Sequence, residues 1–279
     1  MKTSTQLKAL IRNLSKEKSV QAEIILRNYM LERLLERISL SKYRNKFILK
    51  GGMLIAAMVG IDTRATMDMD ATIKGIDLSE DELEKTLNEI IAVPIDDGVV
   101  MKLKKFDNIK DESEYPGIRV SIEAIFDKTK QTIKVDITTG DMITPREIDY
   151  SFRLLLEDRS ISILAYNLET VLAEKLETVL SRSTATTRMR DYYDLYILTT
   201  LRQDDIQWDL FSFAFKRTAE KRGSYNRIME SGDEALNEIE ASEVLYKLWV
   251  RYQQKNSYAS DLNWEDAVAS VKLVYLNLP

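Results

Sequence analysis

Between residues 99 and 137 the apolar residues of this chain recur at every second position, whereas before and after this region they follow the helical period. Such alternation predicts strands, because alternate residues of a strand face opposite sides of a sheet. The predicted strands lie at 99–103, 118–126 and 131–137, with turns at Pro116-Gly117 and Asp127-Lys128. Two further short strands are predicted at 151–156 and 161–164. The middle of the chain must therefore build a sheet.

From Asn167 onward the apolar spacing is helical again. It predicts helices at 167–181, 189–201, 205–222, 235–254 and 261–276. Strands followed by helices predict an α+β fold with an all-helical region behind it. We place the first domain at residues 1–165 and the second, helical domain at residues 166–279.

The first hundred residues combine both kinds of element. A long amphipathic helix is predicted over 19–40, with Glu and Arg residues on its polar face. A short apolar run, 47–49, leads through Lys50-Gly51-Gly52 into a short helix. Residues 66–73 alternate like a strand, and Ser79 with Glu82 forms a capping box for a helix over 79–92.

The chain contains neither cysteine nor histidine. This excludes disulfides, zinc fingers, iron–sulfur clusters, a cysteine nucleophile, a Ser-His-Asp triad and any histidine-ligated metal. Acids, bases and ligands must come mainly from Asp, Glu, Lys, Arg, Tyr, Ser or Thr. A bound metal would have oxygen ligands, which favours Mg²⁺ or Mn²⁺.

No segment has the length of uncharged apolar residues that a membrane span needs, and the N-terminus lacks the apolar core of a secretory signal, so we expect a cytoplasmic protein without membrane contact. Net charge is −5, but it is unevenly spread. Residues 1–50 hold 12 basic and 4 acidic side chains, and residues 51–100 hold 3 basic and 11 acidic ones. A basic surface beside an acidic cluster suits a protein that binds a polyanion near a divalent cation, although the basic residues could equally solvate amphipathic helices.

Asp68 and Asp70 are the strongest local signal of a site. On a strand, residues two apart project from the same face, so these carboxylates can share a cation. Alone, such a pair is common on exposed strands. Asp136 lies in the alternating segment Ile133–Ile137, and it would add a third carboxylate if the two strands are neighbours. Three carboxylates could hold metal ions for phosphoryl or nucleotidyl transfer.

Gly51 and Gly52 precede a short helix, where unhindered backbone N–H groups and the positive helix end could cradle phosphates. Lys175 falls within the apolar face of the helix 167–181. An inward lysine must meet an anion, which could be a triphosphate or a buried carboxylate of the chain, unless its stem reaches solvent.

The segment 188–194 combines charges and rings at a helix start. Asp191 is favoured there by the helix dipole, Arg188 and Arg190 could steady phosphates, and Tyr192 or Tyr193 could stack on a base. A second basic cluster surrounds Gly223 and contains Tyr225; it is either a surface for an RNA backbone or a solvated loop. Its members are Lys216, Arg217, Lys221, Arg222 and Arg227.

Residues 49–73, LKGGMLIAAMVGIDTRATMDMDATI, resemble the first motif of the minimal nucleotidyltransferases of the DNA polymerase β superfamily. The form Arg64-x-Thr66-x-Asp68-x-Asp70, with the later blocks AEKLETVL and RMRDYYDLYIL, is similar to the AbiEii/AbiGii toxin family. The resemblance covers about residues 22–201. It implies a polymerase β-like nucleotidyltransferase domain with a mixed sheet, whose active site the helical domain helps to form.

The resemblance also assigns roles to single residues. Gly51 and Gly52 match the phosphate-binding turn, Asp68 and Asp70 the metal-binding pair, and Asp136 the third carboxylate, which would help to deprotonate the attacking hydroxyl. Lys175 matches the lysine of the helical block and Asp191 the aspartate of the last motif. Beyond these matches, we expect Arg64, Thr66, Lys175 and Arg190 to bind the nucleotide, although Arg64 could equally pair with Asp62 or Asp68.

As a function, the resemblance implies a Mg²⁺-dependent toxin of a bacterial toxin–antitoxin or abortive phage infection system. Such a toxin would transfer NMP from an NTP to RNA, with the 3′ end of tRNA as the expected acceptor, and so block translation. Its partner would be an AbiEi-like antitoxin. Transfer to a small molecule or to a protein hydroxyl, and NTP sensing without turnover, remain alternatives.

Overall fold

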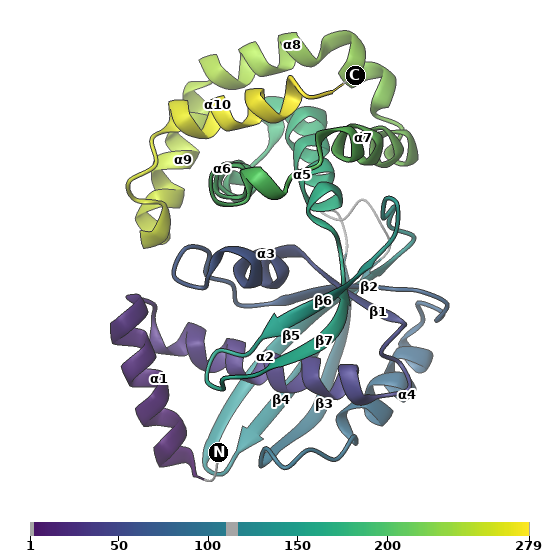
Figure 1. Ribbon diagram of the computed structural model, residues 1–279, viewed down its shortest axis with the longest axis vertical. Coiled ribbons are helices and arrows are strands. Elements are labelled where there is room, and N and C mark those ends of the chain that lie inside the picture. The colour runs from purple at the N-terminus through teal and green to yellow at the C-terminus, as the bar shows by residue number, and fades with distance from the viewer. Residues whose placement is uncertain (1–2, 110–116, 279) are drawn as a thin grey trace. The chain divides into compact units, whose positions relative to one another are not determined.

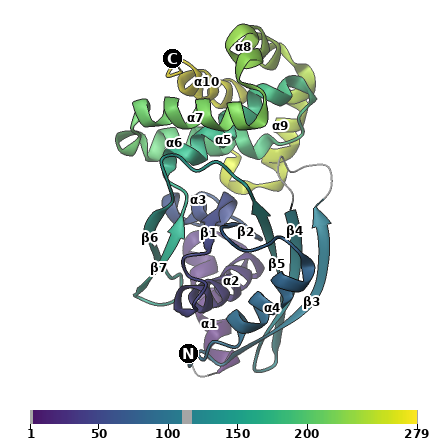
Figure 2. The same cartoon turned by 90° about the vertical axis from the view of Figure 1, so that its right-hand side faces the viewer.

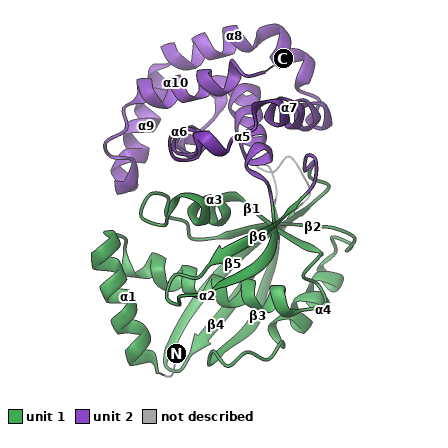
Figure 3. Ribbon diagram, viewed as in Figure 1, with its two compact units in different colours: residues 1–141, 147–165 green, residues 142–146, 166–279 purple. Residues whose placement is uncertain are grey.

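The structure is a computed structural model that describes residues 3–109 and 117–278, so Pro116 of the predicted turn lies outside the described residues. The chain divides into two compact units (Figure 3). Unit 1 comprises residues 1–141 and 147–165, and unit 2 comprises residues 142–146 and 166–279.

Unit 1 is built on a seven-stranded mixed sheet with the strand order β3-β4-β5-β2-β1-β7-β6 (Figure 1). Its strands are β1 Phe47–Lys50, β2 Met69–Ile73, β3 Val99–Ile109, β4 Gly117–Phe126, β5 Thr129–Thr139, β6 Ile148–Arg153 and β7 Ser160–Ala165. The pairs β1–β7 and β2–β5 are parallel, and the other neighbours are antiparallel. Every predicted strand is present. The segment predicted at 151–156 begins earlier and ends at Arg153, because Leu154 N–H bonds to the Arg159 carbonyl in the turn that follows.

Alternation along β4 defines the two faces of this sheet. Ile118, Val120, Ile122, Ala124 and Phe126 are buried on one face. Helix α2 (Ala22–Leu40) packs against β5 and β7, and helix α4 (Glu80–Ile91) packs against β3. Figure 2 shows β5, β4 and β3 side by side in that order. On the other face of these three strands the side chains are exposed or half-exposed, except for the buried Thr138. Unit 1 also contains α1 (Ser4–Lys18) and α3 (Gly51–Val59).

The predicted polar face of α2 is buried as well. Glu32 and Arg33 are each 1% exposed, and Glu36 and Arg37 are buried too. Arg37 binds both oxygens of Asp97 at 2.6 and 2.9 Å. The expectation of a solvated helix face was therefore wrong here, because buried polar groups find charged partners on neighbouring loops.

Unit 2 is helical, as predicted. Its helices are α5 Leu168–Arg182, α6 Met189–Leu201, α7 Trp208–Arg222, α8 Tyr225–Ala241, α9 Glu243–Lys255 and α10 Trp264–Tyr275. Phe211, Phe215, Trp249 and Trp264 are all buried in its core. The helix predicted over 235–254 is instead the end of α8, which begins ten residues earlier at Tyr225, followed by α9. Ser242 adopts an extended conformation between them, and its hydroxyl caps α9 by accepting the Leu245 N–H at 3.3 Å.

Across residues 3–109 and 117–278, none of the helices combines the length and apolarity that crossing a bilayer requires.

Candidate active site

Five charged residues occupy one row across the sheet of unit 1. Strand register places Asp107 of β3 opposite Arg119 of β4, Arg119 opposite Asp136 of β5, Asp136 opposite Asp70 of β2, and Asp70 opposite Lys50 of β1. Residues in register share a face of the sheet. The predicted neighbourhood of Asp70 and Asp136 is therefore confirmed, and two cations flank the two carboxylates.

Asp70 lies at the start of α3. The Gly52 N–H donates a hydrogen bond to Asp70 Oδ2 at 3.2 Å, so the carboxylate occupies the positive end of this helix. Gly51 has φ = +64°, and a Cβ on it would lie 2.0 Å from Asp70 Oδ2. Both the backbone conformation and the close approach require glycine at this position. In this structure the glycine turn thus binds a carboxylate of the chain.

Asp68 precedes the strand that holds Asp70. The prediction began this strand at residue 66, but β2 begins at Met69, and Asp68 lies in a bend just before it. The Thr66 hydroxyl donates a hydrogen bond to the Asp68 carbonyl at 3.3 Å, which helps to hold this bend. Asp68 is half-exposed, so its carboxylate is accessible to a ligand.

Arg64 and Thr66 lie behind the glycine turn. Arg64 is 1% exposed and Thr66 is 4% exposed. A Cβ on Gly52 would lie 2.7 Å from Thr66 Oγ1 and 3.2 Å from Arg64 Nη2. Asn28 of α2 holds this segment by donating to the Thr66 carbonyl at 2.7 Å. Both side chains therefore support the start of α3 from within the fold, and their direct contact with a nucleotide stays a prediction.

Arg119 binds Asp136 at two points. Arg119 Nε lies 2.7 Å from Asp136 Oδ1, and Arg119 Nη2 lies 2.6 Å from Oδ2. The hydrogen bond with Asp136 raises the pKa of Arg119, and burial only partly opposes it; the negative charges of Asp136, Asp68 and Asp70 raise it further. Sequence reasoning missed Arg119. The sequence showed that Arg119 lies on the outward face of the strand predicted at 118–126. It did not show which residue of the neighbouring strand is in register with it.

Lys50 ends the row on the other side. Its ammonium forms an ion pair with Asp141, whose carboxylate also accepts a hydrogen bond from the Thr138 hydroxyl at 3.0 Å. The Lys50 side chain is 13% exposed and that of Asp141 is fully buried. This second cation was also missed, because Asp141 lies far from Lys50 in the sequence.

The donor chemistry of the site suits a hard divalent cation only in part. Asp68 and Asp70 supply carboxylate oxygens, and Mg²⁺ is commonly held by one or two carboxylates together with water and substrate phosphates. In the described part of the chain, no three acidic side chains come close enough together to form a metal site. Arg119 occupies both oxygens of Asp136. Asp68 and Asp70 are therefore the two carboxylates of the predicted set that could hold such a cation together with water and phosphate oxygens.

In unit 2, Lys175 meets buried carboxylates. Its Nζ lies 2.5 Å from Asp191 Oδ1 and 2.8 Å from Asp194 Oδ2, and Arg188 Nε lies 2.9 Å from Asp191 Oδ2. Burial opposes the charged form of Lys175, but the charges of Asp191 and Asp194 outweigh it and raise the pKa of this lysine. Burial also opposes the charged form of Asp191, but Lys175 and Arg188 lower its pKa. Lys175 thus has buried carboxylates of the chain as partners while 15% of its side chain stays exposed, and its contact with a triphosphate stays a prediction.

In the segment 188–194, the remaining arginine is exposed and the two tyrosines are buried. Arg190 is exposed on α6. Tyr192 and Tyr193 are 0% and 2% exposed and pack against Trp264 and Tyr258, with ring centroids 5.0 and 4.9 Å apart. The suggestion that either tyrosine stacks on a base was wrong, because both rings belong to the core of unit 2.

The basic cluster around Gly223 contains one buried and strongly paired member, Arg222. Arg222 is held by Glu177 at 2.5 Å and by Glu174 at 3.2 Å, and its side chain is 7% exposed. Arg227 donates to the Ser181 carbonyl, and Lys216 lies over the Tyr225 ring. Arg222 therefore serves the packing of α5 and α7, whereas Lys216, Arg217, Lys221 and Arg227 are exposed and leave open both an RNA surface and a solvated loop.

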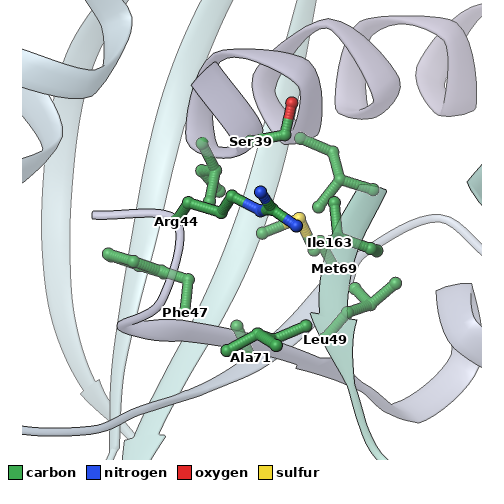
Figure 4. Close-up of a pocket in the computed structure, with 10 residues that line it drawn as sticks. Ser39, Arg44, Phe47, Leu49, Met69, Ala71 and Ile163 are labelled. Carbon is green, nitrogen blue, oxygen red and sulfur yellow. The ribbon is translucent and has the colours of Figure 1, made fainter. Parts of the chain in front are cut away.

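A small apolar pocket lies on the opposite face of the sheet from Asp70 (Figure 4). Met69 and Ala71, which alternate with Asp70 on β2, line it together with Leu49, Phe47 and the Arg44 side chain. It has room for about one water molecule. This pocket is part of the core between α2 and the sheet, and it is too small for a nucleotide.

Comparison with known proteins adds to this geometry. The family model described as "Nucleotidyl transferase AbiEii toxin, Type IV TA system" matches residues 33–270. No curated protein sequence matches the chain. MenT4, a nucleotidyltransferase toxin of Mycobacterium tuberculosis H37Rv, is similar in structure, with a TM-score of 0.54 and 13% identity over 98% of this chain and 99% of that one. A candidate nucleotidyltransferase of Helicobacter pylori gives a TM-score of 0.50 and 16% identity over 93% and 97%. These two likenesses concern the fold.

Proposed function

Because this chain belongs to the AbiEii family of nucleotidyltransferase toxins, we propose that it transfers a nucleotide from an NTP to an RNA acceptor, the 3′ end of tRNA. The family makes the chain a nucleotidyltransferase toxin of a toxin–antitoxin system. The observation that carries the proposal is the register of Asp136 with Asp70, the carboxylate that accepts the Gly52 N–H at the start of α3.

The reaction is attack of an acceptor hydroxyl on the α-phosphorus of the NTP. A bond forms between the hydroxyl oxygen and this phosphorus, the bond to the β-phosphate oxygen breaks, and pyrophosphate leaves. Asp68 and Asp70 would hold Mg²⁺, which neutralises phosphate charge when bound. The chain itself contributes mainly by positioning the two reactants and by stabilising the charge that develops in the transition state, which are the main sources of catalysis in such transfers.

Each group of residues then has a part. The helix start at Gly51 and Gly52 orients the triphosphate beside Asp70, with Arg64 and Thr66 fixing the turn from behind. Asp136 accepts the proton of the attacking hydroxyl when Arg119 releases one of its oxygens. Lys175 and Arg190 of unit 2 bind phosphate oxygens, and Asp191 holds Lys175 in place.

The experiment is a transfer assay with Mg²⁺, total tRNA and each α-labelled NTP in turn, resolved on a denaturing gel beside an Asp68→Ala control. Label on tRNA from one or two NTPs, absent with the control, supports the proposal and identifies the donor. Label on no RNA, with pyrophosphate still released, contradicts it and directs the search to small-molecule or protein acceptors. NTP binding without pyrophosphate release contradicts turnover altogether.

We place the protein beside an AbiEi-like antitoxin, in a system that limits phage infection by blocking translation. The test is growth of cells that express the chain with and without the antitoxin. Growth arrest that requires Asp68 and is relieved by the antitoxin supports this role, whereas unaffected growth contradicts it.

A further inference from the structure

The outward face of β3, β4 and β5 is rich in lysine. Strand register forms rows that run across β3, β4 and β5 in that order. Three of these rows are Val100–Ile125–Lys130, Lys102–Glu123–Thr132 and Lys105–Ser121–Lys134. Asp107, Arg119 and Asp136 form the next row on this same face after that of Lys105 and Lys134. The rows of lysines therefore lead directly to the carboxylates of the site. We call this surface the lysine face, defined by Lys102, Lys104, Lys105, Lys130 and Lys134.

The charges of this face do not cancel. Lys104 pairs with Glu123 at 3.6 Å and Lys105 with Asp107 at 2.6 Å, as Arg119 does with Asp136. Within the described ranges 3–109 and 117–278, no ion pair involves Lys102, Lys130 or Lys134, all of which are exposed. A chain with a net charge of −5 thus keeps three uncompensated cations together on one sheet surface.

These cations lie at useful distances from the site. Lys134 is two residues before Asp136 on β5, just as Asp68 is two residues before Asp70, so it lies about 7 Å along the strand from the row of carboxylates. Lys130 lies about 20 Å from that row along the same strand. Lys102 lies on β3, about 10 Å from β5, in a row between those of Lys130 and Lys134. The span from Lys130 to Asp136 exceeds what a single NTP fills.

We propose that the lysine face binds the phosphate backbone of the RNA acceptor and guides its reacting hydroxyl to Asp68, Asp70 and Asp136. This inference rests on the proposed function and names the surface that the acceptor uses. A polyanion must approach a site that itself carries three carboxylates, so it needs a continuous positive path to that site. Lysines on a flat sheet contact phosphates without reading bases, which suits an acceptor recognised by its backbone.

The test compares wild-type protein with the triple variant Lys102→Glu/Lys130→Glu/Lys134→Glu. The control is Lys85→Glu/Lys247→Glu/Lys255→Glu, which changes the net charge equally at exposed lysines outside this face. Fluorescence anisotropy of labelled tRNA, without NTP, measures RNA binding over a series of salt concentrations. We expect the triple variant to bind about tenfold more weakly or worse, with a salt slope smaller by about two, and the control to bind like wild type.

Transfer kinetics separate this inference from the proposed function. The triple variant should raise the KM for tRNA about tenfold while the KM for NTP stays within about twofold of wild type. If wild-type protein labels tRNA and the triple variant has the same affinity and KM for tRNA, the lysine face is not the acceptor surface. An acidic protein partner would then be the ligand to test on this face. If the control variant loses as much binding, only net charge matters and the inference fails. If wild-type protein neither binds nor labels RNA, the RNA acceptor and this surface fail together.

Discussion

Arg119 and Asp136 face each other directly across β4 and β5 and form a two-point ion pair, with N···O distances of 2.7 and 2.6 Å. The third carboxylate of the site is thus neutralised by an arginine of the chain. Each oxygen of Asp136 keeps a further lone pair, but the positive charge of Arg119 competes with a metal ion for this carboxylate.

We predict that Arg119→Gln lowers the Mg²⁺ concentration that gives half-maximal transfer, by about threefold or more. Loss of the guanidinium leaves the negative charge of Asp136 to attract the cation. The measurement is a Mg²⁺ titration of initial rates at saturating NTP. Lys104→Gln serves as the control, since it removes a cation from the same face that pairs with Glu123 instead. An unchanged Mg²⁺ requirement would show that Arg119 and the metal do not compete.

Gly51→Ala should abolish most transfer, by about a hundredfold or more. The added Cβ would lie 2.0 Å from Asp70 Oδ2, so the carboxylate must move, and small displacements of positioning groups have large kinetic costs. Gly223→Ala is the matched control, because Gly223 also has positive φ (+71°) but a Cβ there meets nothing within 4 Å. Gly223→Ala should lose about 1 kcal/mol of stability in thermal unfolding, and Gly51→Ala should lose more because of the close contact with Asp70. Equal activity of the two variants would show that displacing Asp70 does not slow transfer.

Lys175→Met should destabilise unit 2 by about 3 kcal/mol, because it leaves Asp191 and Asp194 buried without their shared cation. Urea denaturation followed by circular dichroism measures this loss. Adding Asp194→Asn should restore part of the stability, since one buried charge is then removed. The exposed Lys247→Met is the control and should change little. A Lys175→Met protein as stable as wild type would mean that the ion pair does not hold α5 to α6.

Glu32 should make stability depend on pH. Burial raises its pKa from 4.5 to about 8, although the Leu155 N–H bond at 3.0 Å and the charge of Arg33 oppose this. The unfolded chain therefore loses this proton at lower pH than the folded protein does. Its contribution is fully present below pH 4.5 and is lost as pH rises to about 8, by up to about 1.4 kcal/mol per pH unit.

Glu32→Gln keeps the oxygen that accepts the Leu155 N–H but cannot ionise. We expect the difference in unfolding free energy between variant and wild type to grow in favour of the variant from pH 4.5 to about 8 and to stay constant above. Denaturant melts at several pH values test this, with the exposed Glu23→Gln as control. A difference that does not change with pH would show that Glu32 is ionised in the folded protein.

Local patterns were sufficient for most elements of this fold. The strands, the helix that starts at Gly51 and the capping box at Ser79 are determined by residues close together in the chain. The break at Ser242 was missed, because one serine in a helical pattern does not reveal whether its hydroxyl bonds outward or caps the next helix.

By itself the sequence determined the alternation, the helical second half, the Asp68 and Asp70 pair and the exclusion of thiol and imidazole chemistry, since each depends only on residue type and short spacing. Tertiary structure alone decided which charges meet. Arg119 finds Asp136 through the register of β4 and β5, and Lys175 finds Asp191 and Asp194 through the packing of α5 on α6. The physical reason is that register and packing depend on the whole core, whereas a charged side chain in a sequence carries no information about the partner that will neutralise it.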